Sequence, residues 1–407
     1  MVKPVFSRFL RPSPPEVEAR HHPSGFIWAC EGYRLAFSDY VVQTRDMLYK
    51  AHAGRGVDAL ENIVDGNAPF DLKPLAGYPA GKDKTYRRGV LLTHGLSDSP
   101  YFMRHLGAFF QDHGFRVMAV LLPGHGTQPG DLLDAKWQEW AGAVTYGVDR
   151  LAEEVEEVFL AGFSAGGTLS LYQSLRDKRV CGLFLFSPAL RISPRAALAN
   201  FHKLYSWLIP SGKWLDLKQD HDIYKYESFP KNAAAQMYAL TKETDKLLHR
   251  YRLDIPVFIA ASADDATVDV SATLEFISQA RHASNRMVLY TTDTTRIPST
   301  DGNQEPENLE LVSSVIPEQN ILSYSHMSIV LPAEDRHYGV EGEYSNCTHY
   351  YPDDIEQYAA CNNNPRADLQ GELTEKNLKA GVLRRLMYNP KFLTLKVSMK
   401  EFIDNLP

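Results

Sequence analysis

A serine flanked by glycines is the first feature of this sequence that could carry chemistry. Residues 162–166 read GFSAG, the pattern G-x-S-x-G, and they follow an apolar run at residues 158–161. Where a strand turns sharply into a helix, the serine of this pattern is held in a strained backbone conformation that exposes its oxygen. The glycines allow the backbone to pass closely on either side. The pattern therefore predicts Ser164 as a nucleophile, and the alternative is a glycine-rich turn with an incidental serine.

A serine hydroxyl is a weak nucleophile, so a base and an orienting carboxylate should follow it along the chain. In proteins with this motif an acidic residue comes next and a histidine after it, each behind a later strand. Asp264 and Asp265 follow the apolar run 257–261, and His326 follows residues 321–325. Because the two aspartates are adjacent, their side chains point in different directions and only one can face the histidine. Two further histidines compete as the base, although a surface or core role is the default for both: His337 and His349.

Attack by a serine on a carbonyl also requires donors for the oxyanion that forms. The amide of Ala165 is one candidate, because it opens the helix predicted after Ser164. The amide of Leu96 is the other, in the loop after the apolar run 89–93, where Gly95 lets the backbone bend towards the serine. We therefore predict an oxyanion hole formed by Leu96 and Ala165.

The elements that must position these residues alternate between apolar strands and helices. Strands are predicted at residues 89–93, 115–122, 158–162, 180–186, 257–261 and 287–291. Helices are predicted between them, at residues 99–113, 135–156, 165–176 and 270–281. This alternation favours an α/β protein with a mostly parallel central sheet and helices on both faces.

The chain divides into four predicted units: an N-terminal extension at 1–85, an α/β core at 86–190 and 255–335, a cap at 191–254, and a C-terminal region with terminal helices at 336–407. The cap is predicted because an aromatic-rich insertion after the fourth strand should lie over the carboxyl ends of the strands. Residues 292–320 are polar and predicted to form an excursion loop. Apolar residues near helical spacing after Gly371 predict a helical region that Pro390 punctuates.

Composition excludes several classes of function. The 407 residues carry a net charge of −7, so there is no basic excess to neutralise nucleic-acid phosphates. No apolar stretch of the sequence approaches the ~20 residues that span a bilayer. Residues 1–25 lack the apolar core of a secretory signal, which predicts a cytoplasmic protein, although removal of a targeting segment would leave the same sequence.

Neither a cofactor nor a metal ion is predicted. The sequence contains no G-x-G-x-x-G or Walker-type loop for a nucleotide. Asp335, His337 and His349 could meet in space, but they lack the spacing of a metal site. Cys347 and Cys361 lie in one polar loop, where a disulfide and two free thiols are both open. The absence of any other export signal favours the free thiols.

Three stretches of sequence together resemble one branch of the α/β hydrolases. They are THGLSDSP at residues 93–100, LPGHG at residues 122–126 and GFSAGG at residues 162–167. The chain resembles the branch that contains monoacylglycerol lipases, lysophospholipases and serine aminopeptidases, over roughly residues 88–331. The resemblance implies the α/β-hydrolase fold with an inserted cap.

The same resemblance implies a choice between the two aspartates. In the family, a proline opens the strand before the acidic residue and a valine comes after it, and residues 256–268 match this order with Asp265 as the acid. Residues 325–327, which read SHM, resemble the histidine loop of the family. Asp265 and His326 are 61 positions apart (326 − 265), about twice the usual separation, and the polar residues 292–320 account for the difference. The resemblance thus implies a Ser-His-Asp triad.

For function, the resemblance implies hydrolysis of a carboxylic ester through an acyl-enzyme. The aromatic residues of 191–254 favour a small apolar ester, such as a monoglyceride or a lysophospholipid, and peripheral contact with a membrane or lipid is compatible with such a substrate. An aminopeptidase-like enzyme would use the same triad and an acidic group in the cap, for which four residues are candidates: Asp216, Asp220, Asp222 and Glu227. A non-catalytic binding protein on the same fold is the third alternative. The sequence indicates neither the substrate-binding residues nor the oligomeric state.

Overall fold

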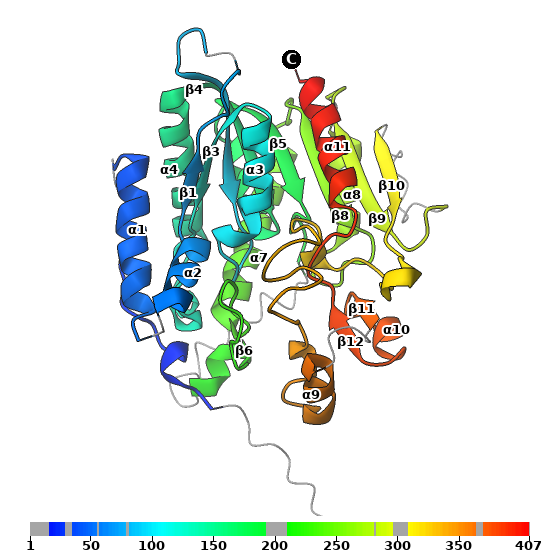
Figure 1. Cartoon of the computed structure of the whole chain (residues 1–407). Coiled ribbons are helices and arrows are strands. Elements are labelled where there is room, and N and C mark those ends of the chain that lie inside the picture. The colour runs from blue at the N-terminus through cyan, green and yellow to red at the C-terminus, as the bar shows by residue number, and fades with distance from the viewer. Residues whose placement is uncertain are drawn as a thin grey trace, which may run out of the picture.

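The computed structural model describes residues 16–28, 35–54, 57–78, 81–192, 210–280, 282–295, 308–363 and 369–406. Its centre is a sheet of eight strands in the order β1-β3-β2-β4-β5-β8-β9-β10 (Figure 1). The strands are β1 (Phe70–Leu72), β2 (Tyr86–Thr93), β3 (Phe115–Val120), β4 (Val155–Phe163), β5 (Val180–Phe186), β8 (Val257–Ser262), β9 (Arg286–Thr291) and β10 (Leu309–Ser313). Only β1 pairs antiparallel within this sheet, so the predicted mostly parallel sheet is confirmed.

Helices cover both faces of the sheet, as the alternating pattern predicts. One face packs under α1 (Phe37–Ala51), α4 (Trp137–Glu154), α5 (Ala165–Ser174), α7 (Lys231–Arg250) and α8 (Val270–Gln279). The other packs under α3 (Arg104–Asp112) and α11 (Phe392–Asp404), which lie in front of the sheet in Figure 1. The other α-helices of the described residues are α2 (Val57–Asn67), α9 (Ile355–Asn363) and α10 (Glu375–Leu378).

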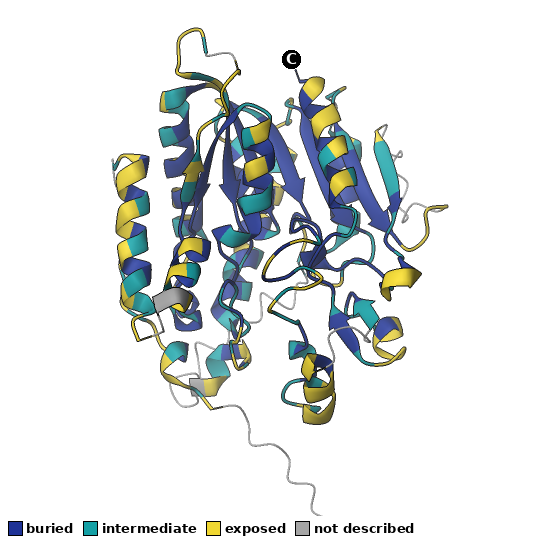
Figure 2. Cartoon of the chain, in the orientation of Figure 1, coloured by how far each residue is buried: buried dark blue, intermediate teal, exposed yellow. Residues whose placement is uncertain are grey.

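The central strands are apolar on both faces because both faces are covered. Successive residues of a strand point to opposite sides, and Val90 and Leu91 accordingly belong to two different buried clusters. Both side chains are fully buried. Figure 2 shows the strands as a continuous buried layer between helices that are exposed on their outer sides. This burial explains why the strands read as apolar runs rather than as alternating sequences.

Two predictions made for the later part of the chain are wrong. Residues 292–320 are not wholly a loop, because β10 lies within them and pairs parallel with β9. An edge strand needs less apolar sequence, and β10 is only partly buried, which is why its composition did not mark it. The helical region predicted after Gly371 is instead the short helix α10, the strand β12 (Leu383–Arg385) and, only beyond Pro390, the helix α11. A proline cannot continue a helix from the preceding turn, so α11 begins after it.

Residues 191–254 divide into parts with different surroundings. Helix α7 packs against α5 and joins the buried cluster under one face of the sheet. A short antiparallel pair, β6 (Trp214–Asp216) and β7 (Phe229–Pro230), precedes it. The aromatic residues Phe201, Tyr205 and Trp207 lie outside the described residues.

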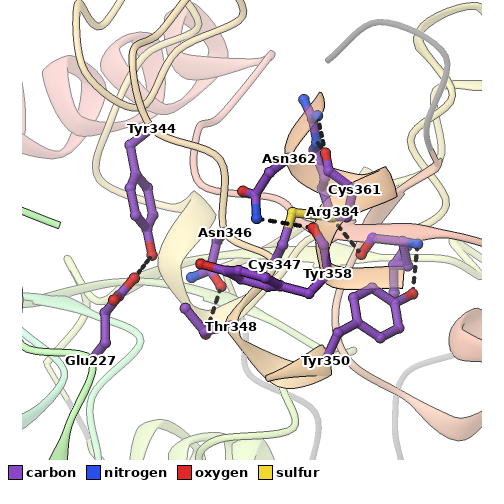
Figure 3. Close-up of a disulfide and its surroundings, with 11 residues drawn as sticks. Glu227, Tyr344, Asn346, Cys347, Thr348, Tyr350, Tyr358, Cys361, Asn362 and Arg384 are labelled. Atoms are coloured by element: carbon purple, nitrogen blue, oxygen red, sulfur yellow. Dashed lines mark hydrogen bonds between the residues drawn. A yellow bond between two sulfur atoms is a disulfide. The ribbon is translucent and has the colours of Figure 1, made fainter. Parts of the chain in front are cut away.

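A disulfide joins Cys347 to Cys361, so the prediction of free thiols is wrong (Figure 3). The bond links the turn at Thr348–Tyr350 to helix α9, and both cysteines are fully buried. Their Cα atoms are 6.0 Å apart, within the range that a disulfide requires. Cysteine content and spacing could not establish this proximity, because it depends on how the 14-residue segment folds. Strand β11 (Leu369–Gly371) follows later in the chain and pairs parallel with β12.

Candidate active site

Ser164 occupies the turn between β4 and α5, where the backbone leaves the ordinary region of conformation. Its φ is +53° and its ψ is −115°, values that non-glycine residues rarely adopt. A Cβ at Gly162 would lie 2.1 Å from the carbonyl oxygen of Gly166, and a Cβ at Gly166 would lie 2.1 Å from that of Thr93. The two glycines are therefore required for the close approach of these segments, and the turn presents a half-buried serine at the end of the strand.

Ser164, His326 and Asp265 form one hydrogen-bonded row. Nε2 of His326 lies 2.9 Å from Oγ of Ser164, and Nδ1 lies 2.6 Å from Oδ2 of Asp265. The other carboxylate oxygen of Asp265 accepts the N–H groups of Thr267 and Val268. Burial alone would raise the pKa of Asp265, but the neighbouring imidazole and these hydrogen bonds outweigh it and lower the pKa. The row therefore ends in a carboxylate held in its charged form.

Asp264 faces away from this row. Its carboxylate accepts the hydroxyl groups of Thr292 and Ser314, at 3.1 and 3.0 Å. These partners belong to the segments after β9 and β10, whereas His326 lies in a separate 3₁₀ turn. Asp265 thus contacts the histidine, whereas Asp264 connects the segments that follow β9 and β10.

The two competing histidines have other partners. The ring of His337 lies 3.3 Å from a carboxylate oxygen of Asp222 and 3.4 Å from one of Glu343. The ring of His349 packs against Tyr350, and burial lowers its pKa to about 4. In the described part of the chain, His326 is the histidine that hydrogen-bonds Ser164.

The loop predicted to supply an oxyanion donor lies directly beside the serine. A Cβ at Gly95 would clash with the carboxylate of Asp98 and would lie 3.2 Å from the Cβ of Ser164, so residue 95 must be small. Leu96 follows in this loop, and Ala165 is the first residue of α5. These positions place one residue on either side of Ser164. That the N–H groups of Leu96 and Ala165 form the oxyanion hole stays a prediction.

A buried histidine holds this loop against its neighbour. Nε2 of His94 accepts the N–H of Leu122 at 3.0 Å, so Nδ1 carries the ring proton and donates to the carbonyl of Gly95 at 2.8 Å. Burial and the adjacent His125 hold the pKa of His94 well below its ordinary value. His94 therefore stays neutral and connects two of the three sequence motifs.

Lys225 and Asp98 also support the loop, and sequence reasoning missed both. Nζ of Lys225 donates to Oγ of Ser97 at 2.9 Å and pairs with the buried carboxylate of Asp98. The N–H of Tyr226 donates to the carbonyl of Ser97 at 2.8 Å. Asp98 lies inside the first motif, which could have drawn attention to it. Lys225 carries no such signal, since a lysine in a polar segment is ordinarily a surface residue.

All four acidic residues considered for an amine-binding role have contacts within the protein, and three of them are hydrogen-bonded to other side chains. Asp220 accepts the hydroxyl of Ser228 and two backbone N–H groups, and Asp222 accepts the hydroxyl of Tyr338. Glu227 accepts the hydroxyl of Tyr344, which joins residues 210–230 to the C-terminal region (Figure 3). The fourth, Asp216, has an exposed side chain, and its carboxylate lies 3.7 Å from Nζ of Lys218.

Glu227 makes the stability of the protein sensitive to pH. Burial raises its pKa to about 7 from an ordinary 4.5. Between these values the folded protein keeps a proton that the unfolded chain releases, so stability falls as the pH rises. Glu227→Gln removes the group whose ionisation destabilises the folded protein. We expect the Tm of the variant minus the Tm of wild type, measured in thermal melts, to become more positive as the pH rises from 4.5 to 8.

The matched control for this prediction is Glu356→Gln, which removes a carboxylate from the exposed side of α9. It should produce no comparable trend with pH. A Tm difference between Glu227→Gln and wild type that stays constant from pH 4.5 to pH 8 would contradict the pKa of about 7.

Two cavities lie near the elements that surround the site. The larger, about 1300 Å³, is formed between α7 and α8, and its lining does not include Ser164, Asp265 or His326. The smaller, about 180 Å³, is lined by Ser97, by residues 126–129 and by Lys225 with its neighbours, and its lining does not include Ser164, Asp265 or His326 either. The larger of these cavities therefore does not mark the position of Ser164. The candidate active site is identified by the hydrogen bonds among Ser164, His326 and Asp265.

Within the described residues, no helix combines the length and apolar character needed to cross a membrane. The same part of the chain contains no group of three His, Cys, Asp or Glu side chains arranged to hold a metal ion.

A parallel sheet of this order, with a serine at the sharp turn after β4, is the α/β-hydrolase fold. Residues 84–292, just over half of the chain, match the family described as serine aminopeptidase, S33. The chain belongs to this family of hydrolases, which confirms the branch indicated by the sequence motifs.

Several individual proteins are similar to this chain. A thermostable monoacylglycerol lipase from Bacillus sp. (strain H-257) is 31% identical over 182 residues, which are 44% of this chain and 71% of that protein. A carboxylesterase from Bacillus subtilis (strain 168) is 32% identical over 85 residues, which are 21% of this chain and only 35% of that protein. The crystal structure of the Paleococcus ferrophilus monoacylglycerol lipase is 19% identical, with a TM-score of 0.42, and the match covers 55% of this chain and 88% of that chain.

Proposed function

We propose that the protein is a serine hydrolase that cleaves a carboxylic ester through an acyl-enzyme. The observation that supports this most directly is the hydrogen-bonded row of Ser164, His326 and Asp265. Such a row supplies a nucleophile, a base to take its proton and a carboxylate to orient the base. The strained, half-buried position of Ser164 suits attack on a substrate at the end of the sheet.

In the proposed reaction, Oγ of Ser164 attacks the ester carbonyl while Nε2 of His326 takes its proton. The tetrahedral oxyanion accepts hydrogen bonds from the backbone N–H groups of Leu96 and Ala165. The bond from the carbonyl carbon to the alcohol oxygen then breaks, the imidazolium gives its proton to that oxygen, and an acyl-enzyme remains. Water attacks the acyl-enzyme with His326 as base, the bond to Oγ breaks as Ser164 recovers its proton, and the carboxylic acid is released. Asp265 stabilises the imidazolium throughout, and its lowered pKa is in accord with this role.

We propose an apolar ester as the substrate class, with contact to a lipid phase where such esters are found. The similarity to a monoacylglycerol lipase supports this choice. An aminopeptidase needs a free acidic group for the substrate ammonium. Asp220, Asp222 and Glu227 are hydrogen-bonded within the protein, and Asp216 already lies 3.7 Å from the ammonium of Lys218. The ester reading is therefore favoured over the peptidase alternative.

We also propose that residues 191–254 act as a cap beside the serine. Lys225 and Tyr226 support it, because both hydrogen-bond Ser97 in the loop that follows Gly95. The proposed core remains residues 86–190 and 255–335, between an extension at 1–85 and a C-terminal region at 336–407.

The disulfide is evidence about the cellular compartment in which the protein resides. Disulfides persist in oxidising environments and are rare in the cytosol, so the Cys347–Cys361 bond favours an oxidising compartment over the cytoplasm expected from the sequence. Alkylation of unreduced extracts followed by mass spectrometry measures this directly. Alkylated Cys347 and Cys361 in the native host would restore the cytoplasmic prediction.

Labelling with a fluorophosphonate probe, followed by peptide mapping, tests the proposed function. We expect modification of Ser164 in wild type and none in His326→Ala. A panel of p-nitrophenyl esters and aminoacyl amides should then show a strong preference for esters. Preference for amides would favour the peptidase. A folded wild type that neither labels nor turns over any substrate would leave a non-catalytic binding protein.

Replacing Asp265 with asparagine should lower kcat by about 10⁴-fold, because an amide partner favours the wrong tautomer of the histidine and cannot stabilise the imidazolium. The matched control is Asp264→Asn, whose carboxylate contacts Ser314 and Thr292 instead. Steady-state ester hydrolysis by both variants measures the difference. A larger loss in Asp264→Asn than in Asp265→Asn would reverse the assignment of the acid.

A further inference from the structure

We propose that the buried ion pair of Glu372 and Arg385 is a positioning device that sets the geometry between His326 and Asp265. The inference rests on the proposed function, because it concerns how the proposed base and its carboxylate are held. Both residues lie in the C-terminal region, outside residues 84–292 that match the family. The device is therefore supplied by a part of the chain beyond the shared core.

Glu372 receives hydrogen bonds from both of the loops that carry the proposed base and acid. Its Oε2 accepts the backbone N–H of His326 at 2.9 Å and that of Ala266, the residue after Asp265, at 3.3 Å. Its Oε1 accepts its neighbour's N–H, from Leu373, at 2.8 Å. The side chain is fully buried. One carboxylate thus joins two loops that are 61 positions apart in the chain.

Arg385 supplies the charge that such a buried carboxylate needs. Its Nε lies 3.0 Å from Oε1 of Glu372 and its Nη2 lies 3.1 Å from Oε2, a two-point contact that fixes orientation as well as distance. The same guanidinium donates to Oγ1 of Thr267. The N–H of Thr267 in turn donates to the carboxylate of Asp265. Arg385 is therefore connected to Asp265 through Thr267.

The C-terminal segment holds the ion pair rigidly. The N–H of Leu386 donates to the carbonyl of Gly371 in the pairing of β12 with β11. The N–H of Arg385 donates to the carbonyl of Asn346, next to the disulfide. Oγ of Ser325, just before His326, donates to the carbonyl of Leu386. In Figure 1, β11 and β12 lie below β8 and β9. The two loops that the ion pair connects follow β8 and β10 in the chain.

This arrangement explains how a histidine on a distant loop reaches the correct position. The segment between Asp265 and His326 contains α8, β9 and β10, so chain connectivity does not fix their spacing. A displacement of about 1 Å in a reacting group can cost 10²-fold in rate. Removing one member of a buried pair leaves the other charged and uncompensated. The pair should therefore influence kcat and the protonation of His326, in addition to stability.

Glu372→Gln is the main test, because glutamine keeps the size of the side chain but loses its charge and one acceptor. We expect kcat for p-nitrophenyl butyrate to fall 10- to 100-fold, with KM nearly unchanged. The rate of fluorophosphonate labelling at Ser164 should fall with it. The uncompensated guanidinium should also disfavour the imidazolium, so the acidic limb of the kcat/KM profile should move to lower pH.

Arg385→Lys and Glu310→Gln complete the design. Lysine keeps the charge but not the two-point contact, so Arg385→Lys should lose kcat while the acidic limb stays in place. Glu310→Gln removes a carboxylate from another ion pair, with Arg286 at 3.1 Å between β10 and β9, and should keep wild-type kcat. All variants are assayed at a temperature where circular dichroism shows them folded.

Wild-type kcat in folded Glu372→Gln, or in Arg385→Lys if the first variant does not fold, would overturn the inference. So would an equal loss of kcat in Glu310→Gln, which would indicate a general effect of destabilisation. Failure of the proposed function is distinguishable, because wild type itself would then show neither labelling of Ser164 nor turnover.

Discussion

Replacing Ser164 with alanine is expected to lower kcat for p-nitrophenyl butyrate by about 10⁶-fold. Alanine removes the attacking oxygen, so no acyl-enzyme can form and only binding and the oxyanion donors remain. The side chain is otherwise small enough that the strained turn should survive, since neither of its flanking glycines is altered. Steady-state hydrolysis at equal protein concentrations, with the active sites of the wild type titrated by a fluorophosphonate, measures the loss.

Ser170→Ala is the matched control for this variant. Ser170 lies on the same helix α5 and is fully buried, so its replacement tests the effect of a lost hydroxyl on the helix without removing the nucleophile. It should retain nearly all of the wild-type kcat. Substantial hydrolysis by purified Ser164→Ala, with burst kinetics preserved, would show that another residue forms the covalent intermediate.

Replacing His326 with alanine should produce a loss of similar size, about 10⁶-fold in kcat, because a serine and its base act as one unit. Without the imidazole, the hydrogen bond through which Oγ would lose its proton is gone. The variant should also lose the acidic limb of the pH profile, which in wild type reports protonation of the free base. Activity measured from pH 5 to pH 9 tests both expectations.

His337→Ala controls for the loss of a buried imidazole. His337 lies between Asp222 and Glu343, and these carboxylates raise its pKa although burial alone would lower it. The variant should lose stability below the ordinary pKa of histidine, where the charged ring contributes most, and keep its kcat in the folded state. A loss of kcat in His337→Ala that matches His326→Ala would reopen the choice of base.

Local sequence was a good predictor wherever the requirement was local. The turn at Ser164 needs small neighbours because the backbones of three segments meet there, and glycine at positions 162 and 166 records that need directly in the sequence. The apolar runs predicted the central strands for a similar reason: a strand covered on both faces needs apolar side chains throughout. Strand β10, at an edge of the sheet, has no such requirement and was missed.

Long-range proximity was beyond the reach of sequence patterns. Order along the chain left Asp264 and Asp265 both open, and only their positions in space show that one faces His326 and the other faces Ser314. Glu372 had no sequence signal, because its partners come from three separate segments. For the same reason the sequence left the pairing of Cys347 with Cys361 open and favoured free thiols, whereas the structure joins them.

The sequence by itself determined the class of fold and the position of the serine, since both depend on short stretches whose composition is dictated by burial and backbone geometry. The tertiary structure decided which aspartate and which histidine hydrogen-bond in line with Ser164, how β10 and α11 complete the sheet and its cover, and which C-terminal residues contact the loops of Asp265 and His326. These depend on contacts between residues far apart in the chain, and such contacts are formed only when the whole core packs.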